Sequence, residues 1–400
     1  MEVTPPPMND MSNNSLPGEA KTITIIGSLN YDLVSVTSRI PKAGETLKGI
    51  SFHSGPGGKG GNQAVAAARL SRNNPRATSR SCENVGINVR MIGAVGEDEF
   101  GHRLVDRLSS DGIDVAGVKF IENVSTGIAA ITVETSNGEN RIILNSGAND
   151  HVSPTAFSSC GLDSIGVRPD LLILQHEIPA ATNLAILRMA REERIPVLLN
   201  PAPGFVLPDE VYRGVTHLIL NESEAEILSL STPGQASQPD FDWSTVGDYF
   251  LQKGVVNVVI TLGARGAFFA SSTPIHCDSP DQPLPTRTVM RPGPAVTDPA
   301  GAGSVSGPVL TEQGYVPAAK VKRVVDTTAA GDTFVGAYAV GLVLGLPWIE
   351  DVVQAACKAS AVTVESAGAQ NSIPWMDEVW NLPNEVAWPR PRAEPPTSAR

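Results

Sequence analysis

The chain has 400 residues, 41% of them hydrophobic, which is enough for one large domain or two small ones with a sizeable buried core. A formal net charge of −12 would repel a phosphate backbone, so nucleic acid is not expected as a partner. No apolar run reaches the roughly 18 residues of a membrane-spanning helix, so no membrane association is expected either.

Cysteine usage and the first residues indicate the compartment. The cysteines lie far apart without metal-binding spacing, which predicts free thiols in a reducing environment: Cys82, Cys160, Cys277 and Cys357. Residues 1–20 are polar and proline-rich and lack the apolar segment of a signal peptide, so we expect a disordered tail there. These features predict a cytoplasmic protein, with the nucleus as a second location.

From residue 21 onward, short β-branched and apolar runs alternate with helical stretches such as 181–194 and 222–230. The expected strands are 22–26, 85–92, 171–174, 196–199, 216–220, 256–260 and 321–325. Near-continuous apolar strands separated by amphipathic helices indicate βαβ units. We therefore predict one doubly wound α/β domain over residues 21–380, with a mainly parallel sheet and helices on both faces.

The stretch 118–145 breaks this alternation. Its apolar runs are separated by a turn at Ser136, Asn137 and Gly138 without any helical pattern, which indicates an antiparallel hairpin. Together with one or two strands from 33–54, it is expected to form a small β-sheet lid over the site.

Two further stretches, 72–84 and 271–317, are rich in Pro, Ser, Asn and Gly. Loops of such length are unusual inside a compact domain, so we interpret both as surface insertions. The last residues, 381–400, have the composition of a second disordered tail.

Polar residues follow most of the predicted strands. Any single one is best explained as a cap or a turn. In an open parallel sheet, however, ligands bind just beyond the carboxyl ends of the strands, so a series of such residues indicates the edge of a site. The residues in question are Asn30, Asp32, Glu177, Asn200, Asn221, Glu224, the loop from Thr261 to Gly266, and the segment that starts at Asp326.

A first glycine-rich stretch, residues 55–69, contains the pattern G-x-G-x-x-G before an Ala-rich helix. We reject a dinucleotide-binding loop because no convincing strand precedes it and the acid expected about 20 residues later would fall within 72–84. A Walker A loop is excluded because Lys59 is followed by Gly60. The glycines then let a ligand approach the backbone, with Lys59 and Asn62 as donors for a polyhydroxyl ligand. Glycine for helix packing alone is the alternative.

A second stretch, residues 324–345, predicts a strand that ends at Asp326 and a helix that begins near Gly331. The backbone N–H groups of Ala329, Ala330 and Gly331 should be unpaired at this helix N-terminus and form an anion pocket. Asp332 in the first turn could simply complement the helix dipole. Beside an anion pocket, it is also suited to take a proton from an attacking hydroxyl, which favours phosphoryl transfer.

Characteristic motifs follow one another over residues 22–378: GSLNYD, GGKGGNQAVAAAR, NPAP, LNESEAE, TLGARG, VDTTAAGDTFVGA and KASAVTVESAGAQNSIPWMDEV. By these motifs the chain resembles the PfkB-type carbohydrate kinases, and especially those that act on ribose. The resemblance implies ATP-dependent phosphorylation of D-ribose at O5, with Mg²⁺ and K⁺, in a homodimer joined through the lid sheet. A kinase for deoxyribose, fructose or adenosine is the first alternative. A catalytically inactive sugar-binding regulator is the second, although Asp332, Glu224 and the Ala-Ala-Gly donors are intact.

The resemblance also implies a role for each matching residue. Asp332 is the expected catalytic base, beside an anion hole formed by Ala329, Ala330 and Gly331. The sugar is expected at Asn30, Asp32, Gly58, Lys59, Gly60, Gly61, Asn62, Glu177 and Asp332. ATP is expected at Asn221, Thr261, Leu262, Gly263, Ala264, Arg265, Gly266, Gly331 and Asp332. Mg²⁺ is expected at Glu224 through water, and K⁺ at Asp326, Thr328, Thr363, Ser366, Gly368 and Ser372.

The chain departs from the family pattern at two places. Gly61 stands where the family commonly has Ala, a small change that should be tolerated. The stretch 271–317 adjoins the expected adenine site near Cys357, so the residue that packs on adenine is not assigned.

Overall fold

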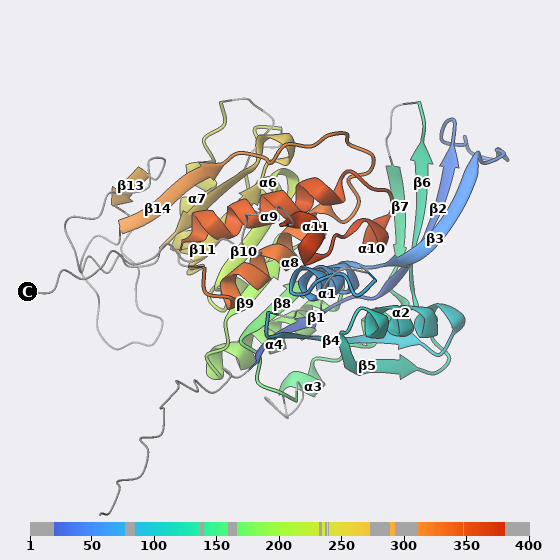
Figure 1. Ribbon diagram of the computed structural model, residues 1–400, viewed down its shortest axis with the longest axis horizontal. Helices are drawn as coiled ribbons and strands as arrows, with labels where there is room; N and C mark the ends of the chain where they lie inside the picture. The colour runs from blue at the N-terminus through green and yellow to red at the C-terminus, as the bar shows by residue number, and fades with distance from the viewer. Residues whose placement is uncertain are drawn as a thin grey trace, which may run out of the picture.

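The computed structural model describes residues 20–76, 85–136, 140–158, 166–231, 234–236, 238, 240–272, 289–292, 310–346 and 348–380. Within these residues the chain forms a ten-stranded sheet and a separate four-stranded sheet (Figure 1). The predicted tails, apart from Ala20, lie outside the described residues, as do 77–84 and much of 273–309.

The large sheet has the strand order β13-β14-β12-β11-β10-β9-β8-β1-β4-β5. Its strands are β1 (Lys21–Ile26), β4 (Ile87–Gly96), β5 (Asp114–Ile121), β8 (Leu171–Gln175), β9 (Val197–Asn200), β10 (His217–Asn221), β11 (Asn257–Thr261), β12 (Ala267–Ser271), β13 (Val289–Pro292) and β14 (Leu310–Val316). The strands from β5 to β11 in this order run parallel, and β12, β14 and β13 add an antiparallel edge. The predicted doubly wound, mainly parallel sheet is confirmed.

Helices cover both faces of this sheet. They are α1 (Lys59–Leu70), α2 (Glu99–Ser110), α3 (Thr155–Ser158), α4 (Ala180–Glu192), α5 (Asp209–Tyr212), α6 (Glu222–Leu228), α7 (Trp243–Gln252), α8 (Ala330–Val343), α9 (Ile349–Thr363), α10 (Ala369–Ser372) and α11 (Met376–Val379), with short 3₁₀ turns at Gly147–His151 and Gly263–Arg265. Leu171 and Ile173 of β8 join the core under α1, α8 and α9, whereas Leu172 and Leu174 join the core under α4 and α7. Burial on both faces explains why these strands are apolar without alternation.

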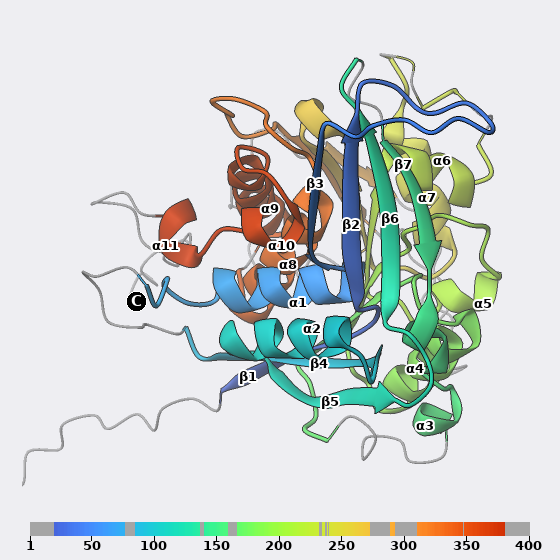
Figure 2. The same ribbon diagram turned by 90° about the vertical axis from the view of Figure 1, so that its right-hand side faces the viewer.

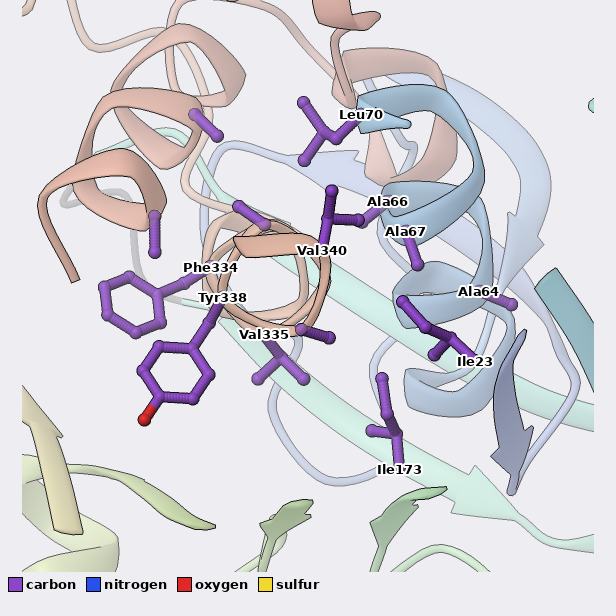
Figure 3. Packing of buried hydrophobic residues seen from close by; sticks show 14 of the residues in the cluster. Ile23, Ala64, Ala66, Ala67, Leu70, Ile173, Phe334, Val335, Tyr338 and Val340 are labelled. Carbon is purple, nitrogen blue, oxygen red and sulfur yellow. The ribbon is translucent and has the colours of Figure 1, made fainter. Parts of the chain in front are cut away.

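The helices α1 and α8 pack closely against each other. A Cβ atom on Gly336 of α8 would lie 2.4 Å from the Cβ of Ala66 and 2.7 Å from the backbone nitrogen of Ala67. Only glycine allows this approach. Ala66 and Ala67 face Val340 of α8 in the close view of the packing (Figure 3). This contact brings the two glycine-rich motifs together.

The small sheet has the order β3-β2-β6-β7 and is formed by β2 (Asn30–Thr37), β3 (Ser51–Gly57), β6 (Gly127–Glu134) and β7 (Asn140–Asn145). Its four strands lie side by side in Figure 2. The predicted hairpin is β6 and β7, which pair antiparallel, and residues 137–139 of its turn lie outside the described residues. The range 33–54 supplies two strands, as expected.

Several predicted boundaries were wrong. Residues 118–121 belong to β5 of the large sheet, because β5 pairs with β4. Residues 321–325 form no strand, since the N–H of Val325 bonds to the carbonyl of Val364 at the end of α9. The range 271–317 is not one insertion, because 289–292 and 310–316 are strands of the sheet. A strand, β3, does precede the first glycine-rich stretch, but it belongs to the small sheet and therefore makes no βαβ unit.

Candidate active site

Asp332 lies in the first turn of α8 and is only 7% exposed. Its Oδ2 accepts a hydrogen bond of 2.9 Å from Nδ2 of Asn62, and its Oδ1 accepts one of 3.0 Å from Nε2 of Gln63. Both donors lie in α1, so the packing of α1 on α8 places the first motif against the second. Asn62 and Asp332 are together as predicted, whereas Gln63 was not among the predicted residues.

Glu177 connects two other segments, the stretch from β1 into β2 and the start of α1. Its Oε2 accepts hydrogen bonds from Oγ of Ser28 at 2.6 Å, from Nδ2 of Asn30 at 3.3 Å and from the backbone N–H of Lys59 at 3.1 Å. Nδ2 of Asn149 in turn donates to Oδ1 of Asn30 at 2.7 Å. Ser28 and Asn149 were missed, although Ser28 lies within the GSLNYD motif and could have been found there.

Asp32 projects from β2 and no described residue donates a hydrogen bond to its carboxylate. Burial, together with the nearby charges of Glu177 and Asp332, raises the pKa of Asp32 to about 7. A carboxylate with open acceptor positions beside two others is suited to bind several hydroxyl groups.

Lys59 is the cation among these carboxylates. Burial lowers the pKa of Lys59, but the attraction of Asp332, Glu177 and Glu224 outweighs this effect, so the pKa is raised and the side chain remains charged. The preceding residue, Gly58, has φ of +82°, and a Cβ there would lie 2.6 Å from the backbone nitrogen of Asn30. Glycine is therefore required at the start of α1.

Gly61 leaves room for a methyl group only if its neighbours yield. An alanine Cβ would lie 3.1 Å from both Nε2 of Gln370 and Cδ2 of Leu29. Glycine at position 61 therefore allows α1 to pack more closely against Gln370 and Leu29 than alanine would.

The expected anion hole is partly occupied by the protein itself. The N–H of Ala330 bonds to the carbonyl of Thr327 at 3.2 Å, so the prediction that it is unpaired was wrong. The turn is tight because Ala329 adopts a left-handed conformation with φ of 60°. For the N–H groups of Ala329 and Gly331, the described residues offer no acceptor.

A cavity of about 530 Å³ adjoins Gly331. This volume lies within the range of small-molecule sites, roughly 300–1,000 Å³. The cavity is lined by Thr261, Gly263, Ala264, Gly266, Ala318, Ala319, Val321, Val324, Thr327, Ala330, Gly331, Phe334, Cys357, Ser360, Ala361 and Val364. Burial raises the pKa of the Cys357 thiol to about 12, so this cysteine acts as an apolar wall. The other three cysteines lie outside the described residues.

Some predicted nucleotide residues do not line this cavity. Leu262 packs in the core on the α4 and α7 side, and Arg265 pairs with Glu222 at the surface. Oδ1 of Asn221 caps α6 by accepting from the N–H of Glu224 at 2.8 Å, and Oε2 of Glu224 accepts from the N–H of Asn221 at 2.9 Å. Burial raises the pKa of Glu224, against the opposing effect of Asn221 and Lys59.

Among the predicted K⁺ ligands, Asp326 contacts both Thr328 and Gly368. Oδ1 of Asp326 accepts from the N–H and the hydroxyl of Thr328 at 2.9 and 2.7 Å, and Oδ2 accepts from the N–H of Gly368 at 2.9 Å. Burial alone would raise the pKa of Asp326, but these hydrogen bonds lower it, so the side chain remains a carboxylate. The hydroxyl of Thr363 points elsewhere, to Thr333 at 2.9 Å.

The two remaining members of that set are bound within their own turns. The N–H of Ser366 bonds to the carbonyl of Thr363 at 3.1 Å, and the hydroxyl of Ser372 bonds to the carbonyl of Ala369 at 2.8 Å. Backbone carbonyls and one carboxylate are hard oxygen donors and fit a monovalent cation.

Arg69, which sequence reasoning missed, holds the segment 370–373 in place. Its Nη1 donates to the carbonyls of Gln370 and Ile373 at 2.7 and 2.8 Å, and its Nη2 pairs with Asp111 at 2.8 Å. Both charged side chains are 3% exposed. No local sequence signal connects these residues, because they lie on three separate elements.

The buried Asp332 carboxylate lies in the same turn as the N–H groups of Ala329 and Gly331, between the polar cluster around Glu177 and the cavity. This arrangement defines a phosphotransferase site. The model of the pfkB family of carbohydrate kinases matches residues 20–304 and 304–376, and the chain belongs to that family. The chain is 38% identical over 361 residues to a ribokinase from Schizosaccharomyces pombe. The aligned region covers 89% of this chain and 96% of the relative.

Solved structures agree with this family. Ribokinase from Thermotoga maritima has a TM-score of 0.65 at 30% identity, covering 90% of this chain and 98% of that one. Ribokinase from Arabidopsis thaliana, in complex with ribose and ATP, has a TM-score of 0.68 at 25% identity with the same coverage.

None of the described helices is long and apolar enough to cross a membrane.

Proposed function

We propose that this protein is an ATP-dependent kinase that converts D-ribose and ATP into D-ribose 5-phosphate and ADP. One observation carries the proposal: the buried Asp332 carboxylate is held by Asn62 and Gln63 between the cluster around Glu177 and the cavity of about 530 Å³. Family membership and the relatives named as ribokinases support the choice of sugar.

The sugar is bound by acceptors that the protein leaves open. Asp32 offers a carboxylate without a protein donor, and Oδ1 of Asn62 is buried without a hydrogen-bond partner among the described residues. Glu177 and Asn30 supply further carboxylate and amide groups. Sugar hydroxyls satisfy these groups, and a buried acceptor gains most from such a donor.

In the chemical step, Asp332 takes the proton of the 5-hydroxyl as the oxygen attacks the γ-phosphorus of ATP. The O5–P bond forms, and the bond between the γ-phosphorus and the β,γ-bridging oxygen breaks, which releases ADP. The N–H groups of Ala329 and Gly331 face the charge on the transferring group and stabilise it.

The residues present also fit the two cations. The described residues contain no cluster of three or more His, Cys, Asp or Glu side chains for a metal. A Mg²⁺ ion that keeps most of its waters and binds phosphate oxygens needs one carboxylate nearby, and Glu224 supplies it. Asp326 and the carbonyls around Gly368 would hold K⁺. When bound, these cations neutralise phosphate charge and polarise the anion hole.

The outer part of the lid sheet is proposed to join two copies of the chain. Its strands and the adjoining loop expose large apolar side chains, which are Ile50, Phe52, Ile142, Ile143 and Leu144. These side chains lie on the two edge strands of the small sheet and in the loop before β3, and exposed apolar side chains in this number favour an interface. Action in the cytoplasm, and also in the nucleus, remains a prediction.

A coupled assay of ADP formation tests the proposal, with Mg²⁺ present and with ribose, deoxyribose, fructose and adenosine compared in potassium and sodium buffers. We expect fastest turnover on ribose, with a decrease in sodium. Preference for another of these substrates would make the chain a different kinase of the same family. Absence of turnover on all four would contradict a kinase function and favour a sugar-binding regulator.

A further inference from the structure

A chain of buried amides, Gln63, Gln175 and Asn200, connects Asp332 to the large sheet. Nε2 of Gln63 donates to Oδ1 of Asp332 at 3.0 Å and also to Oδ1 of Asn200 at 3.1 Å. Oε1 of Gln63 accepts from Nε2 of Gln175 at 2.7 Å. Gln63 and Gln175 are fully buried and Asn200 is 8% exposed, so water does not substitute readily for these partners.

The amide chain is anchored in the large sheet. Gln175 ends β8 and Asn200 ends β9. Nδ2 of Asn200 donates to the carbonyl of Ile219 in β10 at 3.0 Å, and the carbonyl of Gln175 accepts from Nδ2 of Asn183 at 2.7 Å. Three neighbouring strands therefore fix the position of the Gln63 amide.

The orientation of that amide is also determined. Because Gln175 presents an NH₂ group, Gln63 must turn its oxygen toward Gln175 and its NH₂ toward Asp332. The reversed amide would place an oxygen against the Asp332 carboxylate and leave buried donors unpaired, which is costly.

We infer that Gln63 is a positioning residue that orients the Asp332 carboxylate toward the attacking hydroxyl, and that Gln175 and Asn200 hold Gln63 in place. The inference rests on the proposed role of Asp332 as the base. Asn62 holds the other oxygen, Oδ2, and belongs to the predicted sugar site, whereas Gln63 makes no hydrogen bond to Asn30, Asp32, Lys59 or Glu177. Loss of Gln63 should therefore disturb the geometry of proton transfer and leave sugar binding intact.

The test compares kcat, KM for ribose and Tm of the wild type with those of Gln63→Leu and Gln175→Leu. Displacement of a catalytic group by about 1 Å can cost roughly 10²-fold in rate, so we expect a fall of about that size in kcat for Gln63→Leu with nearly unchanged KM. Gln175→Leu leaves the donor to Asp332 in place and removes one of the two anchors of Gln63 in the sheet, while Asn200 remains, so a smaller fall in kcat is expected.

Asn257→Leu is the matched control for damage to the fold. Asn257 is 8% exposed at the start of β11 and accepts a hydrogen bond of 2.7 Å from Ser271, remote from Asp332. This variant should lower Tm and leave kcat unchanged. If it lowers kcat as much as Gln63→Leu does at a similar Tm, the role of Gln63 is only structural and the inference is wrong.

Two further outcomes separate the inference from the function on which it rests. An active wild type, an inactive Asp332→Asn and an unchanged kcat in Gln63→Leu would overturn the inference and leave the proposed function standing. A wild type without turnover on any sugar would overturn both.

Discussion

Asn62 contacts Asp332 across 270 positions of sequence, and its amide has two separate tasks. Nδ2 donates to the carboxylate at 2.9 Å, while Oδ1 is buried without a partner among the described residues. One side chain therefore fixes the base and offers an acceptor to the substrate.

Asn62→Ala should impair both tasks. A hydrogen bond to a charged group contributes about 1.5–3 kcal/mol, so we expect kcat/KM for ribose to fall about 10- to 100-fold, with KM raised and kcat lowered. Steady-state kinetics check this. A change confined to KM would show that Asn62 does not help to hold Asp332.

Asp332→Asn removes the base and keeps the shape of the side chain. General-base catalysis is worth about 10²- to 10⁴-fold, so kcat should fall by at least that range, whereas ribose affinity measured by calorimetry should change little. Turnover at the wild-type rate would exclude Asp332 as the base.

Ribose binding should depend on pH through Asp32, whose pKa is about 7 in the free protein. Hydroxyl groups donate to the ionised carboxylate, so bound sugar lowers this pKa and affinity is greater above pH 7 than below it. Calorimetric affinities on either side of pH 7 test the direction. In Asp32→Asn this dependence should disappear. An affinity that rises toward low pH would contradict the assignment.

The buried pair of Arg69 and Asp111 should matter more for stability than exposed pairs do. Asp111→Ala leaves the charge of Arg69 uncompensated, and breaking such a pair costs about 3–5 kcal/mol in the free energy of unfolding. Urea unfolding measures this. Arg188→Ala, which breaks an exposed pair with Glu210, is the control and should cost less than about 1 kcal/mol.

The proposed dimer predicts that Ile143→Lys yields monomers. Ile143 is 68% exposed in the single chain, and a charge at the centre of an apolar interface opposes association. Light scattering coupled to size-exclusion chromatography gives the mass. Lys320→Glu, which lies outside the four-stranded lid sheet, should leave the mass unchanged. A monomeric wild type would contradict the proposal.

Local patterns were sufficient for the α/β class and for much of the site. Apolar strands buried on both faces are recognisable without long-range information, and the carboxyl end of each strand follows from its position in the chain. Asn30, Asp32 and Glu177 were predicted in this way, whereas Asp332 was predicted from its place in the first turn of a helix. The edge strand β14 was missed because Leu310–Val316 mixes polar and apolar residues and pairs antiparallel at the edge, where no continuous apolar run is needed.

The sequence by itself determined the α/β class and most of the central strands and long helices, because hydrophobic periodicity and glycine act over a few residues. Only the tertiary structure decided that Gln63 reaches Asp332 and that Arg69 reaches Gln370. The first contact depends on how closely α1 approaches α8, which the absence of a side chain at Gly336 permits, and the second depends on the packing of α10 against α1. A side-chain partner hundreds of positions away is set by packing, and packing is a property of the whole fold.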